Sequence, residues 1–394
     1  HWVFEENVNS KIQVEILVEN RASENTDHIN LKKNNVNTIQ IDKTKSLTIV
    51  NSVQKEILKK LIFILFKKNK PYNIQLIKLH LEAYFYIGYC LKNNIKAFMA
   101  SENYLPITTV MNMIGAKIPL KTFSYQYSNL SRVVNPIMQT TADFMFIFSN
   151  LYNNRYSYNE CKPTKLISNG YLYSSSFPLI KKKIHEYKNK YINNKEDFII
   201  TYFDENFQKN DDKFGFFNQN DYCHEINKLA DYINKYEKTK IISKSQFTRN
   251  SASISCHSEK LSTLINQKKW IELSQGELRN NIFPAEASCI SDIIIAQVVG
   301  ATAGLEAALT GKRCILLNPK NLITDNTKIF NKENIMFPNI ESALNAITSF
   351  RNGDVEYKGL GRWNNIIDMF DEFQDNDASK RLRKKIEDEI LTNY

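Results

Sequence analysis

The chain has 394 residues, which is too long for one ordinary domain and fits two domains of roughly 150–200 residues. A hydrophobic content of 42% is enough for two cores, but no uninterrupted apolar stretch approaches the ~20 residues of a membrane span. The net charge of +10 would favour an acidic substrate or anionic lipid head groups, although a composition rich in Lys, Asn and Ile accounts for most of the lysines by itself. No nucleic-acid-binding motif is found, so we expect no nucleic acid as a partner.

The six cysteines and six histidines show no spacing typical of a metal site. There is no C-x-x-C pair and no H-E-x-x-H motif, so we expect no bound metal. Buried free thiols in a reducing compartment are favoured over disulfides. We recognise no signal peptide at the start of the chain, and the expected location is cytoplasmic.

The first part of the chain passes from irregular sequence to a regular alternation of strands and helices. Strands are predicted at 12–18 and 47–50, with a loop and a short strand between them. The following elements are helices at 53–68 and 74–93, strands at 95–100, 118–125 and 144–148, and helices at 105–114 and 136–141. Repeated βα units of this length imply an α/β fold with a parallel, doubly wound sheet.

Polar residues follow two of these strands, at the sheet edge where ligands bind in parallel sheets. Glu102 follows the strand at 95–100 and is a candidate base for an acceptor hydroxyl, because partial burial raises the pKa of a carboxylate. Alternatively, Glu102 only offsets the dipole of the next helix. Gln126 and Tyr127 follow the strand at 118–125 and are candidate acceptor-binding residues.

A domain boundary is predicted near residues 150–180. A strand at 166–171 runs into an Asn-Gly turn, so we expect a first domain at 1–172 and a second at 173–375. The second domain begins with a Lys-rich helix at 177–192. Further βα units follow, with strands at 198–203, 240–243 and 270–273 and helices at 221–235, 257–266 and 283–289.

Two strand-end residues of the second domain are candidates for contacts with a donor. Lys244 follows the strand at 240–243 and would pair with a phosphate as a point charge, although lysines after strands are commonplace. Gln297 directly follows a strand at 293–296. Its amide would contact a base or a sugar. Alternatively, the amide makes its hydrogen bonds within a loop.

Small residues cluster in the segment that follows this strand. Gly300, Ala303 and Gly304 leave little side chain to block a ligand, and three of the 11 glycines of the chain fall between residues 300 and 311. Such clustering indicates close backbone approach, either to a ligand or between a helix and the sheet.

A helix beginning near Thr302 would point unpaired N–H groups and a partial positive charge at a ligand. We expect a diphosphate to be held there by backbone amides and the Thr302 hydroxyl. Glu306 lies one helical turn further on, where its carboxylate would accept hydrogen bonds from ribose hydroxyls. The alternative is a tightly packed helix with a solvated Glu306. Beyond the next strand, at 314–317, a strand is predicted at 334–337 and helices at 341–349, 363–370 and 378–391.

The pattern SD-φφφ-xxxxx-ATAGLEAALTGK-xφφφφ-NP, which spans 291–319, resembles the donor half of GT-B glycosyltransferases. More narrowly, it resembles enzymes that build bacterial surface polysaccharides. The resemblance implies two Rossmann-like, doubly wound domains facing a cleft, with a C-terminal helix at 376–394 crossing back to the first domain. It also implies that the helix at Thr302 binds the diphosphate of a nucleotide-sugar and that Glu306 holds the ribose. The run Gln126-Tyr127-Ser128 resembles a Gln-His-Gly turn of these enzymes, but Tyr127 replaces the His, so no catalytic His is carried over.

The leading interpretation is a metal-independent glycosyltransferase. It would transfer a sugar from a nucleotide-sugar donor to a surface polysaccharide or lipid-linked glycan, without a cofactor, in the cytoplasm or peripheral to the inner face of the membrane. A sugar-nucleotide 2-epimerase of the same fold is the second interpretation, although its cleft would require acidic and histidine residues and the histidines are sparse. The third is a non-catalytic glycan- or partner-binding protein that retains the fold.

Overall fold

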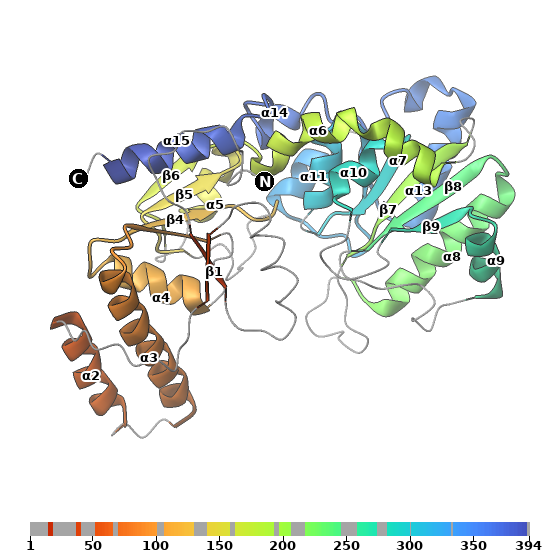
Figure 1. The fold of residues 1–394 in the computed structure, drawn as a ribbon. Coiled ribbons are helices and arrows are strands. Elements are labelled where there is room, and N and C mark those ends of the chain that lie inside the picture. The colour runs from red at the N-terminus through yellow and green to blue at the C-terminus, as the bar shows by residue number, and fades with distance from the viewer. Residues whose placement is uncertain are drawn as a thin grey trace. The chain divides into compact units, whose positions relative to one another are not determined.

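The computed structural model describes residues 15–18, 37–40, 52–65, 70–100, 106–129, 140–157, 162–192, 197–205, 217–245, 258–273, 282–299, 301–331 and 334–391. The chain divides into two compact units, each containing a parallel sheet (Figure 1). The first unit comprises His1–Tyr127, Val134–Leu172 and Asp377–Tyr394, and the second comprises Ser128–Val133 and Tyr173–Asn376.

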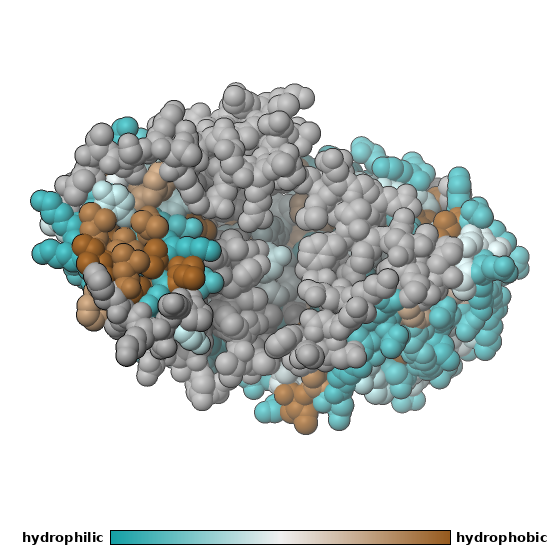
Figure 2. Space-filling model, turned by 90° about the horizontal axis from the view of Figure 1, so that it is seen from below, coloured by the Kyte–Doolittle hydropathy of each residue, from teal (hydrophilic) through white to brown (hydrophobic). Residues whose placement is uncertain are grey.

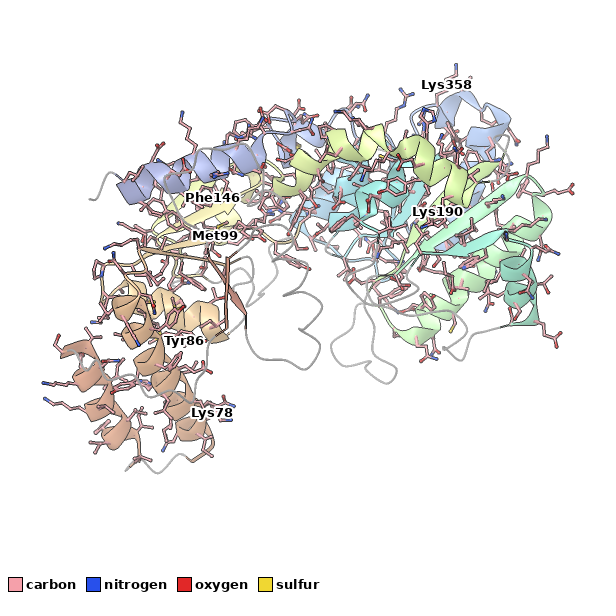
Figure 3. All side chains as sticks on the ribbon, viewed as in Figure 1. Lys78, Tyr86, Met99, Phe146, Lys190 and Lys358 are labelled. Atoms are coloured by element: carbon pink, nitrogen blue, oxygen red, sulfur yellow. The ribbon has the colours of Figure 1, made fainter. Side chains whose placement is uncertain are left out.

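The first unit is built on a four-stranded parallel sheet in the order β3-β4-β5-β6. Its strands are β3 (Ala97–Ala100), β4 (Lys121–Tyr125), β5 (Phe144–Ile147) and β6 (Lys165–Ser168). Its helices include α2 (Ser52–Leu65), α3 (Lys70–Lys92), α4 (Pro106–Gly115) and the single turn α5 (Asn153–Tyr156). Side chains alternate across β3, as expected for a pleated strand, with Phe98 packed against the core of α3 and α4 and Met99 against the opposite core (Figure 3). A separate two-stranded parallel sheet joins β1 (Glu15–Val18) and β2 (Asn37–Gln40).

The last helix, α15 (Ala378–Leu391), covers the other face of the first sheet (Figure 1). Leu382 of α15 is buried in one core with Phe123 and Phe146 of the sheet. The side-chain amide of Asn169 donates to the carbonyl of Ala378 at 3.0 Å, which fixes the start of the helix. The prediction that the C-terminal helix returns to the first domain is confirmed.

The second unit contains a six-stranded parallel sheet in the order β12-β11-β10-β7-β8-β9. Its strands are β7 (Phe198–Phe203), β8 (Thr239–Lys244), β9 (Trp270–Glu272), β10 (Ile293–Gln297), β11 (Arg313–Leu317) and β12 (Met336–Phe337). Helices α8 (Gln219–Lys235) and α13 (Ile340–Asn352) pack on one face, and α10 (Pro284–Cys289) and α11 (Thr302–Leu309) contact strands and each other on the opposite face. The remaining helices are α6 (Phe177–Lys182), α7 (Ile184–Tyr191), α9 (Glu259–Asn266), α12 (Asp325–Phe330) and α14 (Ile367–Phe370). The predicted parallel, doubly wound α/β architecture is confirmed.

In both units an aspartate that precedes a strand accepts a hydrogen bond from the backbone of the neighbouring strand. The carboxylate of Asp292, which precedes β10, accepts from the backbone N–H of Ile199 at 2.7 Å. Asp143 precedes β5 and accepts in the same way from Thr122 at 2.8 Å. Both carboxylates supply an acceptor to a backbone donor at the start of the neighbouring strand, and such donors are costly to bury unpaired.

Several local predictions were wrong. The helix expected at 177–192 is two helices, because the backbone leaves helical geometry at Lys183 (φ −91°, ψ 2°). The helix expected at 363–370 is confined to α14, and α12 was not predicted. Cys223 is disulfide-bonded, contrary to the expectation of free thiols, whereas Cys90, Cys289 and Cys314 are free and buried. The strand expected at 47–50 and most of the helix expected at 136–141 lie outside the described residues.

Candidate functional site

The strand order of the second sheet reverses between β7 and β10, because β8 follows β7 on one side and β10 lies on its other side. In open parallel sheets, ligands bind beyond the carboxyl ends of the strands at such a switch point. Asp204 follows β7, Lys244 ends β8 and Gln297 ends β10. The helix α11 begins a few residues beyond Gln297. Lys244, Gln297 and the start of α11, which were all predicted to bind the donor, therefore lie at one edge of one sheet.

The turn into α11 contains a strained residue. Ala301, the N-cap of α11, has φ 43° and ψ 21°, in the left-handed region. This region is uncommon for residues other than Gly, Asn and Asp, and it costs on the order of 1–3 kcal/mol when the surroundings impose it. Thr302 and Ala303 follow in the first turn and are partly exposed. Gly300, also predicted to bind the donor, lies outside the described residues.

The hydroxyl of Thr302 is held by a neighbouring stretch of the second unit. Its Oγ1 lies 2.6 Å from the hydroxyl of Ser128 and accepts from the backbone N–H of Asn129 at 2.8 Å. The side-chain amide of Asn326, in α12, donates to the carbonyl of Asn129 at 3.2 Å and to its side-chain oxygen at 3.1 Å. Ser128 and Asn129 directly follow the predicted acceptor-binding pair in sequence, and this contact was not foreseen.

Gly304 is a packing residue in the structure. A Cβ built at this position would lie 2.9 Å from Cδ2 of Leu316 and 3.2 Å from Sγ of Cys314. Glycine thus allows α11 to approach β11 closely, which is one of the roles of glycines in nucleotide-binding βα units. A direct contact of Gly304 with a donor stays a prediction.

Glu306 is buried, with a hydrogen-bond partner at the start of a neighbouring helix. Its Oε1 accepts from the backbone N–H of Ala285, in the first turn of α10, at 2.7 Å. A carboxylate at this position satisfies one of the backbone donors that have no partner within the helix, and it offsets the positive end of the helix dipole. Glu306 therefore has a structural role in addition to the predicted ribose contact, which stays a prediction.

Lys244 is a buried cation at the same edge. Its ammonium donates to the carbonyl of Ser245 at 2.6 Å. Burial lowers the pKa of Lys244, while the negative charges of Asp204 and Glu306 act in the opposite direction. Both carboxylates are thus near enough to the amine to influence its titration. Pairing of this amine with a phosphate stays a prediction.

The amide of Gln297 is engaged inside the unit. Its Nε2 donates to Oε2 of Glu225 at 2.7 Å, and the hydroxyl of Tyr202 donates to the same oxygen at 2.6 Å. Burial raises the pKa of Glu225 to about 8, against the opposing effect of these two hydrogen bonds. Sequence reasoning missed Glu225. A signal existed, since Glu225 shares the apolar face of α8 with Tyr222 and Leu229 at helical spacing.

The candidate acceptor residues differ in accessibility. The side chain of Gln126 is buried, and its Oε1 accepts from the backbone N–H of Phe148 at 2.9 Å. Tyr127 is 41% exposed. Glu102 lies outside the described residues. Within the described part of the first unit, Tyr127 is therefore better placed than Gln126 to meet a ligand.

Among the residues that the structure describes, no group of three or more His, Cys, Asp and Glu side chains is arranged to hold a metal ion. No helix in the described part of the chain is both long and apolar enough to cross a bilayer.

Comparisons with known proteins bear on the fold. No protein-family model and no curated protein match the sequence. A structure of the wall teichoic acid polymerase TagF matches with a TM-score of 0.51 at 10% identity, covering 88% of this chain and 99% of that one. A TagF variant soaked with CDPG also gives 0.51, at 9% identity and with the same coverage. The UDP-GlcNAc 2-epimerase of Methanocaldococcus jannaschii gives 0.47 at 11% identity, covering 86% of this chain and 92% of that one. The two TagF matches support a GT-B-like arrangement of parallel sheets and at this identity show the fold alone.

Proposed function

We propose that this protein is a GT-B-type glycosyltransferase that transfers a sugar from a nucleotide-sugar donor to a surface polysaccharide or a lipid-linked glycan. The observation that supports the proposal is the pair of positive features at the switch point of the second sheet, the buried amine of Lys244 and the first turn of α11. Both are located where parallel sheets bind ligands, and both favour an anion. The left-handed Ala301 adds to this, since such strain concentrates at ligand sites.

In this scheme the donor binds along the carboxyl edge of the second sheet. Backbone amides of Gly300, Thr302 and Ala303 and the Thr302 hydroxyl hold the diphosphate, with Lys244 as a compensating cation. Glu306 accepts from the ribose hydroxyls, and Gln297 contacts the base or sugar by exchanging its bond to Glu225. Gly304 lets the helix lie close to both the sheet and the donor.

The chemistry follows from charge and proton balance. The bond between the anomeric carbon and the diphosphate breaks, a bond from an acceptor oxygen forms, and the acceptor hydroxyl loses its proton. The leaving nucleoside diphosphate takes the electron pair, and the helix dipole and the amine of Lys244 stabilise that charge, so no metal or cofactor is required. Glu102 would accept the proton if the reaction inverts the anomeric centre, with Tyr127 and Gln126 beside the acceptor.

The test is release of nucleotide from a panel of UDP-, GDP- and CDP-linked donors in the presence of a lipid-linked acceptor. The CDP-linked donors are included because TagF was soaked with CDPG. We expect release that depends on the acceptor and persists in a chelator. If the reaction inverts the anomeric centre, Glu102→Gln should abolish it. Conversion of a UDP-sugar without acceptor would identify a 2-epimerase, and binding without turnover of any donor would identify a non-catalytic protein.

Lys244→Met adds a test of the donor site. We expect it to weaken donor binding by more than about tenfold, because a phosphate then lacks its buried cation. Lys240→Met is the matched control, since Lys240 lies at the other end of β8 and pairs with Asp197 at 3.0 Å. The control should lose stability but keep donor affinity. Equal affinities of the two variants would contradict the assignment of Lys244.

A further inference from the structure

Helices α2 and α3 form a hairpin in the first unit with an apolar outer surface. The two helices pack together, with Val53 and Ile57 of α2 against the core that contains Tyr86 of α3, and the side-chain amide of Gln54 donates to the carbonyl of Tyr84 at 2.8 Å. Large apolar side chains also lie on the outside of both helices. We call these exposed residues the hairpin patch: Leu58, Ile62, Phe63, Leu65, Tyr72, Ile74, Leu76 and Leu81.

Part of the hairpin patch forms a row along one side of α2. On α2, Leu58, Ile62 and Leu65 follow one another at helical spacing, and Ile62 and Phe63 are 58% and 63% exposed. Figure 2 shows a hydrophobic area at the end of the first unit that α2 and α3 form. Single exposed apolar residues are ordinary, but contiguous apolar patches on soluble surfaces mark interaction sites.

Exposed lysines are interspersed with the hairpin patch on the same two helices. Lys55, Lys59 and Lys60 are exposed on α2, and Lys78 is exposed on α3 (Figure 3). The sequences of the two helices contain six lysines against two glutamates, and one of these, Glu56, already pairs with Lys60 at 3.6 Å. The partner must therefore accept apolar side chains and carry negative charge around them.

These properties distinguish between occupants. Protein interfaces are depleted of Lys, whereas helices that lie in a membrane interface combine Leu and Phe on one side with Lys at the border. A symmetric contact with a second copy would place like-charged lysines opposite one another. We propose that the hairpin patch docks this protein onto an anionic lipid surface, with α2 lying in the head-group region.

This inference depends on the proposed function only in that a lipid-linked acceptor would be presented at the same surface. It is tested without donor or acceptor, by sedimentation of the full chain with vesicles of phosphatidylcholine alone or mixed with phosphatidylglycerol. Wild type should bind the mixed vesicles more strongly. Ile62→Ser/Phe63→Ser should bind more than about tenfold more weakly to both kinds, because the apolar area buried in lipid is lost.

Two further variants make the test specific. Ile323→Ser/Val355→Ser is the matched control, since Ile323 and Val355 are 79% and 76% exposed in the second unit; it should bind as wild type does. Lys59→Gln/Lys60→Gln should weaken binding only to the anionic vesicles, by roughly fivefold per lysine. All the substituted side chains are exposed, so folding should be preserved, which circular dichroism will confirm.

The inference is overturned if wild type fails to bind the mixed vesicles, or if the Ile62/Phe63 variant binds them equally well. The inference is also overturned, in favour of self-association, if wild type is a dimer in sedimentation velocity, the Ile62/Phe63 variant is a monomer, and neither binds vesicles. Vesicle binding without turnover of any donor contradicts only the proposed function. Turnover with a soluble acceptor but no vesicle binding contradicts only the lipid inference.

Discussion

The side-chain hydroxyl of Thr302 accepts a hydrogen bond from the backbone N–H of Asn129, with 2.8 Å between oxygen and nitrogen. Because Asn326 donates to Asn129 as well, one residue joins the first turn of α11 to α12. The Thr302 oxygen can accept from Asn129 and still donate its own proton, so a nucleotide-sugar that uses this hydroxyl would compete with Ser128, whose hydroxyl lies 2.6 Å away. A nucleotide-sugar that uses only the backbone amides would not. If the donor binds this hydroxyl, the bond from Asn129 would hold the Thr302 oxygen in place while its proton is donated to the phosphate.

The first prediction concerns Thr302→Val, which keeps the side-chain shape and removes the hydroxyl. The N–H of Asn129 then lacks its acceptor, at a cost of about 1–3 kcal/mol, and the melting temperature should fall by a few degrees. Nucleoside diphosphate affinity, measured by calorimetry, should fall about tenfold. Thr310→Val is the control, because Thr310 is at the other end of α11 and bonds to the carbonyl of Ala307 at 2.7 Å. Equal affinities of Thr302→Val and wild type would exclude the hydroxyl from the donor site.

The second prediction separates two roles of Glu306. Glu306→Gln keeps an oxygen acceptor for the N–H of Ala285, so its melting temperature should stay within a few degrees of wild type, whereas Glu306→Ala should lower it further. Both variants should bind nucleotide more weakly if the carboxylate accepts from the ribose. Wild-type affinity in Glu306→Gln would leave the residue with the structural role alone.

The third prediction is that Gly304→Ala destabilises the second unit by about 1–3 kcal/mol, because the added methyl group overlaps Leu316 and Cys314. The shift of the midpoint in urea measures this. Gly359→Ala is the matched control, as a Cβ at Gly359 meets nothing within 4 Å; it should change stability by less than about 0.5 kcal/mol. If both variants unfold at the same midpoint, the close approach of α11 to β11 is not what requires glycine.

The fourth prediction concerns pH. The pKa of Glu225 is raised from an ordinary 4.5 to about 8, so the folded state holds a proton that the unfolded state has released at intermediate pH. The stabilisation is full below pH 4.5 and is lost as the pH rises toward 8. Glu225→Gln removes this dependence, and its stability relative to wild type should increase by up to about 4 kcal/mol across this range. If the urea midpoints of wild type and Glu225→Gln differ by the same amount at every pH from acid to alkaline, the raised pKa of Glu225 is contradicted.

The sequence was sufficient where local patterns decide the structure. Strand β7 and helix α15 have the predicted bounds, 198–203 and 378–391, because an unbroken apolar run and a charged amphipathic pattern each leave few alternatives. The position of Lys244 was predictable for the same reason, since it stands at the end of the strand predicted at 240–243. At Gly304 the residues allowed either a ligand or close packing, and the distances to Leu316 and Cys314 show the packing.

The remaining features depend on partners that are distant in the chain. Thr302 and Asn129 are 173 positions apart, and Gln297 and Glu225 are 72 positions apart. No periodicity specifies which strand-end amide meets which helical carboxylate. The disulfide at Cys223 was missed in the same way, because spacing along the chain does not report proximity in space.

The central claim is that the carboxyl edge of the second sheet binds a nucleoside diphosphate. The most direct measurement is the thermal shift of the purified chain with CMP, CDP, UDP and GDP, since a ligand that binds only the folded state raises apparent stability. We expect at least one diphosphate to raise the melting temperature by a few degrees in wild type and to lose this effect in Lys244→Met. No shift with any nucleotide, or an unchanged shift in Lys244→Met, would contradict the account.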